Sequence, residues 1–193
     1  MIIPKEIKEA IILKQQRSVG DFASQLQDEY SALIPYLPPH CNIIWDIGAG
    51  LGGIDIFLSK HYPEKPDIYL TDYDRVDDNV FFGFNQKYCA YNQFSLTKKL
   101  LDANEIENYY FDMLDEVRRL PYFADIIISL LSCGFHYPVS TYVNDIIQRS
   151  VKGTVLILDM RTGHDQREIL SQYFETVALL PYRKWARYIG VRK

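Results

Sequence analysis

Glycines follow an apolar segment that carries a carboxylate, and these residue types in this order suit the binding of a small ligand. The run from residue 42 to residue 53 reads Asn-Ile-Ile-Trp-Asp-Ile-Gly-Ala-Gly-Leu-Gly-Gly, so Asp46 precedes Gly48, Gly50 and Gly52. Because glycine has no Cβ, the backbone there can turn tightly and come close to a ligand. The run predicts a loop for a nucleotide-type cofactor. It also contains the G-x-G-x-x-G pattern of dinucleotide-binding proteins, so it leaves the cofactor open.

Other side chains able to bind a ligand or move a proton follow later apolar segments. Asp72 and Asp112 each follow a short apolar segment directly, and His136 and Tyr137 lie beyond the most apolar one, residues 124–130. A carboxylate accepts two hydrogen bonds from a vicinal diol, so an acid at a strand end can orient a ribose. An imidazole titrates near neutral pH, so His136 is suited to accepting a proton.

Apolar segments that alternate with helical patterns must position these residues. The strands that we expect cover residues 42–47, 68–71, 109–111, 124–130 and 154–158. The helices that we expect cover residues 51–61, 88–103, 142–149 and 166–173. Continuously apolar strands that alternate with helices imply a parallel sheet covered on both faces, with ligands at the carboxyl ends of the strands.

The last two expected strands, residues 174–180 and 185–191, are separated by only four residues. Such a connection is too short for a parallel crossover and long enough for an antiparallel hairpin. We therefore predict an α/β fold. It is a Rossmann-like, doubly wound, mostly parallel seven-stranded sheet with a C-terminal antiparallel hairpin and N-terminal helices.

Residues 1–40 precede this alternating region. Their apolar side chains recur near helical spacing, interrupted at Gly20, which predicts one or two amphipathic helices that could cap the cofactor site. Prolines within residues 35–39 end the region too close to the first strand for a flexible linker. We predict one domain over residues 1–193, with the helical cap followed by a cofactor-binding core over residues 41–193.

The composition disfavours several classes of protein. A net charge of -4 and a pI near 5.6 give no overall attraction to nucleic acid or to an anionic membrane. The cysteines number 3 and form no C-x-x-C pair, so neither a disulfide framework nor a zinc site is expected. Asp125, Asp159 and His164 show no spacing that requires a metal, and we predict none. No long apolar run suggests a signal or membrane segment, so we expect a soluble, cytoplasmic protein.

The motif Asp-x-Gly-x-Gly-x-Gly at residues 46–52, together with the closing hairpin, resembles the class I S-adenosylmethionine-dependent methyltransferases. The resemblance covers the chain from residue 42 to its end. It implies S-adenosyl-L-methionine as the cofactor and S-adenosyl-L-homocysteine as the product. It also implies a loop under the cofactor made by Gly48, Ala49, Gly50 and Gly52.

The resemblance implies further cofactor contacts, one residue at a time. These contacts are Asp46, Asp72, Tyr73, Asp112, Met113 and Ser129. Asp46 matches the acid near the methionine end of the cofactor, Asp72 the acid that holds the ribose, and Asp112 the residue that meets the adenine amine. Met113 matches a contact to the adenine ring. Singly, each acid could instead cap a helix or belong to a turn, and Asp74 is the alternative for the ribose.

The charges of the cofactor support this assignment. S-adenosylmethionine carries a sulfonium and an ammonium but no phosphate, so the carboxylate of Asp46 complements it. The same carboxylate beside the pyrophosphate of a dinucleotide would be repulsive, because such loops attract anionic oxygens to a helix N-terminus. A nicotinamide-dependent oxidoreductase is therefore only a remote alternative.

Residues 129–138 occupy the place where this family receives its acceptor. A hydroxyl acceptor must lose a proton and be aligned with the methyl group, so we expect His136 as the general base and Tyr137 as a positioning group or alternative base. Both side chains could instead stack over the adenine or hold the loop. The segment lacks the Asn/Asp-Pro-Pro-Tyr run of relatives that methylate amides. Its Gly-Phe-His-Tyr-Pro run resembles small bacterial methyltransferases associated with sugars, so we expect a small-molecule acceptor, first of all a saccharide hydroxyl.

Several points stay open in the sequence. Residues 77–93 are rich in amides and aromatics, which suits either a polar substrate surface or a lid. A basic group could meet an anionic acceptor or form a solvated edge; it consists of Arg161, His164, Arg183, Lys184 and Arg187. The functional alternatives are a non-catalytic S-adenosylmethionine-binding module and a methyltransferase of protein or nucleic acid. The last would need a basic face around residues 183–192.

Overall fold

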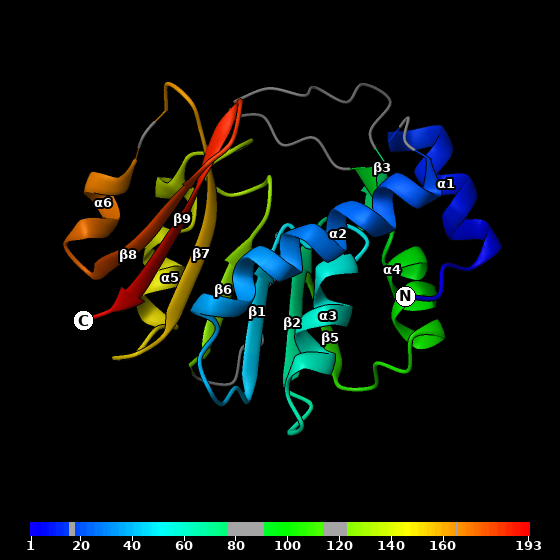
Figure 1. Ribbon diagram of the computed structural model, residues 1–193, viewed down its shortest axis with the longest axis horizontal. Helices are drawn as coiled ribbons and strands as arrows, with labels where there is room; N and C mark the ends of the chain where they lie inside the picture. Colours follow the sequence, from blue (N-terminus) through cyan, green and yellow to red (C-terminus); the bar gives the residue numbers. More distant parts are fainter. Residues whose placement is uncertain (16–17, 77–90, 114–122, 165) are drawn as a thin grey trace.

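A seven-stranded sheet forms the centre of the molecule in the computed structural model (Figure 1), which describes residues 1–15, 18–76, 91–113, 123–164 and 166–193. The strand order is β5-β2-β1-β6-β7-β9-β8. The strands are β1 (Ile43–Ile47), β2 (Asp67–Asp72), β5 (Tyr109–Met113), β6 (Ile126–Ser129), β7 (Val155–Arg161), β8 (Phe174–Pro181) and β9 (Trp185–Arg192). Strands β3 (Arg75–Val76) and β4 (Tyr91–Asn92) form a separate antiparallel pair.

The directions of the strands confirm the predicted fold class. Strands β5, β2, β1, β6 and β7 are parallel to one another, whereas β9 is antiparallel to both β7 and β8. The last strand of the chain therefore lies between β7 and β8, and the hairpin closes the sheet on that side. Strand β8 is the edge strand, and most of its side chains are exposed.

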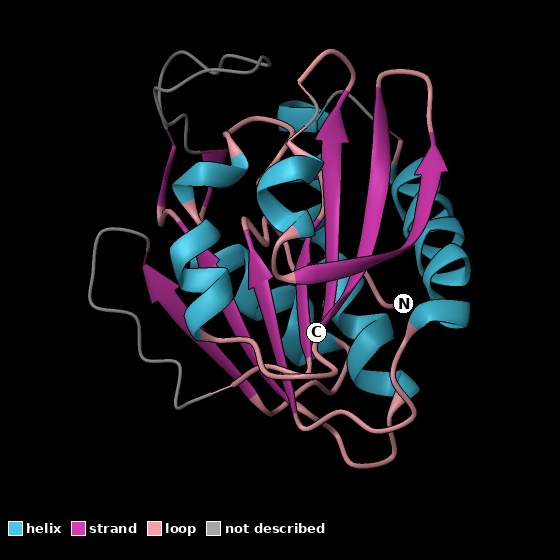
Figure 2. Ribbon diagram, turned by 90° about the vertical axis from the view of Figure 1, so that its left-hand side faces the viewer, coloured by secondary structure: helices cyan, strands magenta, loops and turns pink. Residues whose placement is uncertain are grey.

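Helices cover both faces of the sheet (Figure 2). The helices are α1 (Lys5–Gln15), α2 (Val19–Leu33), α3 (Gly53–His61), α4 (Phe94–Ala103), α5 (Val143–Gln148) and α6 (Arg167–Ser171), with short 3-10 turns at Ile34–Tyr36 and Val139–Thr141. Helices α1 to α4 pack in one hydrophobic cluster and α5 with α6 in another. No helix in the described part of the chain is long and apolar enough to cross a bilayer.

The two hydrophobic clusters follow from the alternation of side chains along each strand. In β1, Ile44 points into the cluster with helices α1 to α4, and Trp45 and Ile47 point into the cluster with α5 and α6. The central strands are buried on both faces, so their sequences are continuously apolar rather than alternating.

Two predicted helix boundaries are wrong. Helix α4 begins at Phe94 rather than at residue 88, because Tyr91–Asn92 pairs with β3 and the side chain of Asp74 accepts a hydrogen bond from the Phe94 backbone N–H at 2.8 Å. In the N-terminal region Gly20 lies inside α2, and the helix begins after Ser18, whose Oγ accepts from the Asp21 N–H at 3.0 Å. The expected substrate surface over residues 77–93 lies mostly outside the described residues.

Candidate functional site

Three of the predicted acids lie at the carboxyl edge of neighbouring parallel strands. Asp46 lies near the end of β1 and Asp72 ends β2. In β5, Asp112 is the partner of Thr71 in β2, which is in turn the partner of Ile47 in β1. Parallel strands bring these positions to one edge of the sheet, as the sequence analysis predicted.

The glycine loop, residues 48–52, is in close contact with the loop that follows β6. Gly48 has φ +76°, and a Cβ at this position would lie 2.0 Å from Oγ of Ser132. A side chain at position 48 is therefore excluded both by the backbone conformation and by the neighbouring loop. Gly50 differs, because a Cβ there would meet no atom of the described residues within 4 Å. With respect to the described part of the chain, the apex of the glycine loop is therefore open, so that a ligand can approach the backbone.

Asp72 and Thr97 hold this apex from two sides. The backbone N–H of Gly50 donates to Oδ2 of Asp72 at 2.8 Å, and Oγ1 of Thr97 in α4 donates to the Gly50 carbonyl at 2.8 Å. The other carboxyl oxygen of Asp72 accepts from the Tyr73 N–H at 2.7 Å, and Asn92 Nδ2 lies 3.4 Å from Oδ2. Asp72 therefore fixes the loop and stays half-buried at the edge of the sheet. Burial raises its pKa to about 6, although these hydrogen bonds oppose the shift.

Asp46 is paired with a second acid that the sequence analysis did not identify. Asp55, in the first turn of α3, is fully buried, and Asp46 is 2% exposed. No described residue hydrogen-bonds to either carboxyl oxygen of Asp55, and the negative charges of the two buried acids repel each other, which favours a proton on one of them. Burial, and then the charge of Asp55, raises the pKa of Asp46 well above its ordinary value. We call Asp46 and Asp55 the acid pair.

Asp112 lies on the opposite face of the sheet from the acid pair. Its strand partner Thr71 accepts a hydrogen bond from Nε1 of Trp45 at 2.8 Å, and Trp45 belongs to the cluster with α5 and α6. Asp112 is buried, while Met113 next to it is half-buried. Tyr73, beyond Asp72, is buried under the guanidinium of Arg75, whose Cζ lies 4.5 Å from the ring centroid. The adenine contacts expected of Asp112 and Met113 stay predictions.

Ser129 links β1 to the loop after β6. Its hydroxyl donates to the carbonyl of Ile47 at 2.5 Å and accepts from the N–H of Cys133 at 2.9 Å, and the side chain is fully buried. Both bonds are internal, so the structure gives Ser129 a role in positioning the two loops. A direct contact of Ser129 with a cofactor stays a prediction.

The loop that carries the predicted base, residues 130–138, is a compact turn that we call the His136 loop. The carbonyl of Ser132 accepts from the backbone N–H groups of Phe135, His136 and Tyr137 at 3.0, 2.8 and 3.2 Å. Gly134, at φ +88°, donates to the Tyr137 carbonyl at 2.7 Å. These bonds fix His136 and Tyr137 on the turn whose first part contacts the glycine loop.

The side chains of His136 and Tyr137 are both partly exposed, as an acid–base group at a binding site must be. The His136 ring meets Phe135 edge to face, with centroids 4.9 Å apart, and lies 6.4 Å from Tyr137. On the other side, Cζ of Arg161 lies 4.8 Å above the Phe135 ring. The structure therefore brings His136 and Tyr137 together on the turn whose Ser132 contacts the glycine loop; their chemical roles stay predictions.

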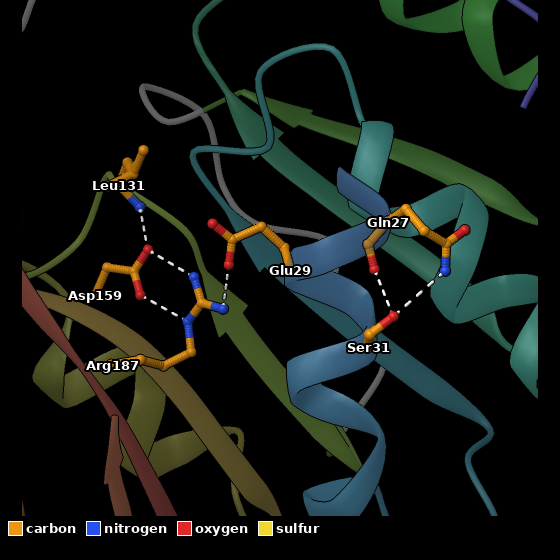
Figure 3. A network of polar contacts seen from close by, with 6 residues as sticks. All are labelled: Gln27, Glu29, Ser31, Leu131, Asp159 and Arg187. Atoms are coloured by element: carbon orange, nitrogen blue, oxygen red, sulfur yellow. Dashed lines mark hydrogen bonds and ion pairs between the residues drawn. The ribbon is translucent and has the colours of Figure 1, made fainter. Parts of the chain in front are cut away.

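A buried ion-pair network supports the His136 loop from below (Figure 3). Arg187 in β9 donates to both carboxyl oxygens of Asp159 in β7, at 2.8 and 3.1 Å, and also to Glu29 of α2. Oδ2 of Asp159 accepts from the N–H of Leu131, which has a left-handed φ of +56°. We call Glu29, Leu131, Asp159 and Arg187 the Arg187 cluster. It joins helix α2, the hairpin and the first turn of the His136 loop.

The Arg187 cluster corrects one expectation from the sequence. Arg187 was grouped with surface cations that could meet an anionic acceptor, but its side chain is fully buried and paired with two acids. Arg161 stacks on Phe135 instead of standing free in solvent. Arg183, Lys184 and His164 are exposed near the hairpin and the end of β7. In the described part of the chain, no three His, Cys, Asp or Glu side chains gather as a metal site requires.

Sequence reasoning missed Asp55 and Glu29. Asp55 had a detectable signal, because it stands between Ile54 and Ile56 at the start of an otherwise apolar helix, where a carboxylate is costly. Glu29 had none, since a single acid on an amphipathic helix is ordinary.

Several solved structures with a similar arrangement of strands and helices are methyltransferases. No protein-family model and no curated protein matches the chain in sequence. The ribosomal protein L11 methylase of Lactobacillus delbrueckii subsp. bulgaricus aligns with a TM-score of 0.62 at 13% identity, over 89% of this chain and 79% of that one. Precorrin-6y C5,15-methyltransferase of Geobacter metallireducens GS-15 gives 0.58 at 17% identity, over 86% and 89%.

A third similar structure contains a ligand. Magnesium protoporphyrin IX methyltransferase of Synechocystis PCC 6803, with bound S-adenosylmethionine, aligns with a TM-score of 0.57 at 18% identity, over 90% of this chain and 81% of that one. At these identities the similarity concerns the fold. The chain has the fold of the class I S-adenosylmethionine-dependent methyltransferases.

Proposed function

We propose that this protein is an S-adenosylmethionine-dependent methyltransferase. The observation that carries the proposal is the glycine loop, which follows the buried acid Asp46. Its apex at Gly50 is held by Asp72 and is open with respect to the described residues. The similar structure with bound S-adenosylmethionine supports the choice of cofactor. An acid without a cation of its own suits a cofactor that brings two positive charges and no phosphate.

Each residue of the site then has a role that its chemistry supports. Asp46 attracts the cationic methionine end, and Asp72 accepts hydrogen bonds from the ribose hydroxyls with the lone pairs that Gly50 and Tyr73 leave free. Asp112 and Met113 meet the adenine. When bound, the cofactor supplies an electrophilic methyl group, and the protein aligns the acceptor with it.

We propose a hydroxyl acceptor, with a saccharide as the first candidate. His136 is a partly exposed imidazole on the turn whose Ser132 contacts the glycine loop, so it can take the proton that a hydroxyl must lose. Aromatic rings lie nearby, because Arg161 stacks on Phe135 and is the strand partner of Trp185, which itself stacks on Tyr182 with ring centroids 3.6 Å apart. Aromatic faces together with exposed cations suit a polar ring substrate.

The cofactor assignment is tested by comparing Asp72→Asn with Asp74→Asn. Asp72 is the proposed ribose ligand, whereas Asp74 caps α4 through its Oδ1, a role that an asparagine can fill equally well. We expect Asp72→Asn to weaken S-adenosylhomocysteine binding about tenfold or more, and Asp74→Asn to change it less than about twofold, in isothermal titration calorimetry. Absence of any binding to the unmodified protein would refute the cofactor.

The acceptor assignment needs a transfer measurement. The protein is incubated with cofactor labelled on the methyl group and with panels of saccharides, nucleosides, small acids, proteins and RNA, and labelled products are identified by mass spectrometry. We expect label on a sugar hydroxyl, and about 100-fold slower transfer in His136→Gln with unchanged cofactor affinity. Label on protein or RNA would favour the alternative acceptors. Cofactor binding without transfer to any of them would favour a non-catalytic binding module.

A further inference from the structure

The acid pair is buried, and the proposed function assigns a role to only one of its two acids. Asp46 belongs to β1 and is the proposed neighbour of the methionine end, but Asp55 belongs to α3 and has no assigned role. Both side chains are almost completely buried. No donor of another described residue reaches either carboxyl oxygen of Asp55.

The described residues around the pair provide no cation for it. Among the described residues no ion pair includes Asp46 or Asp55, and the remaining charge that acts on Asp46 is another acid, Asp72 of β2. The charged side chains of α2 and α4, the helices that pack against α3, form ion pairs with other residues or lie at the surface. From α2, Glu29 is paired with Arg187, and from α4, Lys98 and Lys99 are paired with Asp102 and Glu6.

The position of Asp55 suits the negative charge of the pair. Asp55 lies in the first turn of α3, where the helix dipole favours an anion. Asp46 then carries the shared proton. Burial raises the pKa of Asp55 to about 6, so the pair holds one negative charge at neutral pH and becomes neutral when the pH falls below that value.

We propose that Asp46 and Asp55 act as one anionic unit with a single shared proton, and that Asp55 is a second determinant of cofactor affinity. This inference rests on the proposed function, since the group that the pair would bind is the ammonium of S-adenosylmethionine or S-adenosylhomocysteine. Affinity for that end of the ligand falls as acid neutralises the pair. A cation that binds the charged form of the pair in turn favours release of its proton.

The test compares two ligands that differ only at the methionine end. S-adenosylhomocysteine has the ammonium, and 5′-methylthioadenosine lacks the amino-acid part but keeps the adenosine. Any effect of Asp72 on the ribose is common to both ligands, so it cancels in the comparison. Each ligand is titrated calorimetrically at pH 7.5, 6.0 and 5.0.

For the unmodified protein we expect S-adenosylhomocysteine to lose about tenfold more affinity than 5′-methylthioadenosine between pH 7.5 and pH 5.0. In Asp55→Asn the pair keeps a hydrogen-bond donor for Asp46, and removal of the neighbouring charge lets Asp46 ionise at lower pH. In this variant, S-adenosylhomocysteine should lose at most about threefold more affinity than 5′-methylthioadenosine between pH 7.5 and pH 5.0. Asp102→Asn, at an exposed acid of α4, is the matched control and should behave as the unmodified protein does.

The outcomes separate this inference from the proposed function. Equal pH dependence for the two ligands would overturn the role of the acid pair while leaving the cofactor assignment intact. If Asp55→Asn leaves the pH dependence of S-adenosylhomocysteine affinity unchanged, Asp55 has no role in cofactor affinity, and the cofactor assignment again stays intact. Failure of S-adenosylhomocysteine to bind at any pH would refute both. The comparison of the two ligands on the unmodified protein tests the role of the acid pair even if Asp55→Asn does not fold.

Discussion

Asp55 and Asp159 are two fully buried carboxylates on the same side of the sheet, the side that carries α2 and α3, yet their surroundings are opposite. Asp159 receives two hydrogen bonds from Arg187 and one from the backbone of Leu131. Asp55 faces another acid, Asp46, and no cation among the described residues. One carboxylate is compensated by the protein itself, and the other is not.

The difference separates a structural role from a ligand-binding role. Burying a charge is costly unless a partner compensates it, so folds usually retain an uncompensated acid where something else supplies the compensation. The Arg187 cluster obtains its compensation within the chain and holds α2, the hairpin and the His136 loop together. The acid pair obtains it, on our proposal, from the cofactor.

The strongest test of the comparison removes the cation from the compensated acid. Arg187→Met leaves Asp159 and Glu29 without their shared partner, and breaking a buried pair in this way costs about 3–5 kcal/mol of unfolding free energy. Urea denaturation at pH 7.5 measures this loss. The control is Arg183→Met, at an exposed position of the hairpin turn, for which we expect a change within about 0.5 kcal/mol. A loss below about 1 kcal/mol for Arg187→Met would show that the cluster is not structural.

A ligand should compensate the acid pair as Arg187 compensates Asp159. S-adenosylhomocysteine at about 100 times its dissociation constant should add about 2.7 kcal/mol to the unfolding free energy. In the double variant Asp46→Asn with Asp55→Asn, which removes both acids, a tenfold weaker affinity would reduce the gain to about 1.4 kcal/mol at the same concentration. Equal gains in both proteins would argue against the acid pair as a cation site.

The third test uses pH. The folded-state pKa of Asp55, about 6, lies above that of an unfolded Asp, so the folded protein binds more protons between about pH 4 and pH 6 and loses stability as the pH rises through this range. Asp55→Asn removes this penalty. We expect the variant to match the unmodified protein at pH 4.5 and to exceed it by an amount on the order of 2 kcal/mol at pH 7.5. A variant less stable at pH 7.5 would mean that the Asp55 charge is compensated after all.

The smallest effect is expected at the rim of the Arg187 cluster. Glu29→Gln removes one charge from α2 but leaves the bidentate contact between Arg187 and Asp159, so a loss of about 1 kcal/mol in unfolding free energy is expected. Ser31→Ala, which removes an exposed hydrogen bond on the same helix, is the control and should change stability by less than about 0.5 kcal/mol. An effect of Glu29→Gln as large as that of Arg187→Met would assign most of the compensation to α2.

The sequence predicted the sheet and its carboxyl edge well, because both follow from local patterns. Continuous apolar runs marked the buried parallel strands, and the four-residue connection marked the hairpin. Helix boundaries were less predictable, since the start of α4 depends on Asp74, twenty residues earlier in the chain. Local pattern cannot reveal such a cap.

The same limit applies to the site. Asp46, Asp72 and Asp112 could be placed from their positions after apolar segments, because the topology of parallel strands brings such positions to one edge. The pairing of Asp46 with Asp55, and that of Arg187 with Glu29, depends on side-chain directions and on contacts between distant elements. Arg187 was therefore assigned to the surface although it is buried.

The contact between Gly48 and Ser132 has a consequence for the order of events at the site. The two loops touch so closely that no Cβ fits between them, and Ser129 bonds the ends of both. A ligand that shifts the backbone at position 48 must therefore also shift the turn that presents His136. On the proposed function, the cofactor site and the acceptor site lie on these two loops. The factor by which the cofactor changes the affinity for the acceptor is then equal to the factor by which the acceptor changes the affinity for the cofactor.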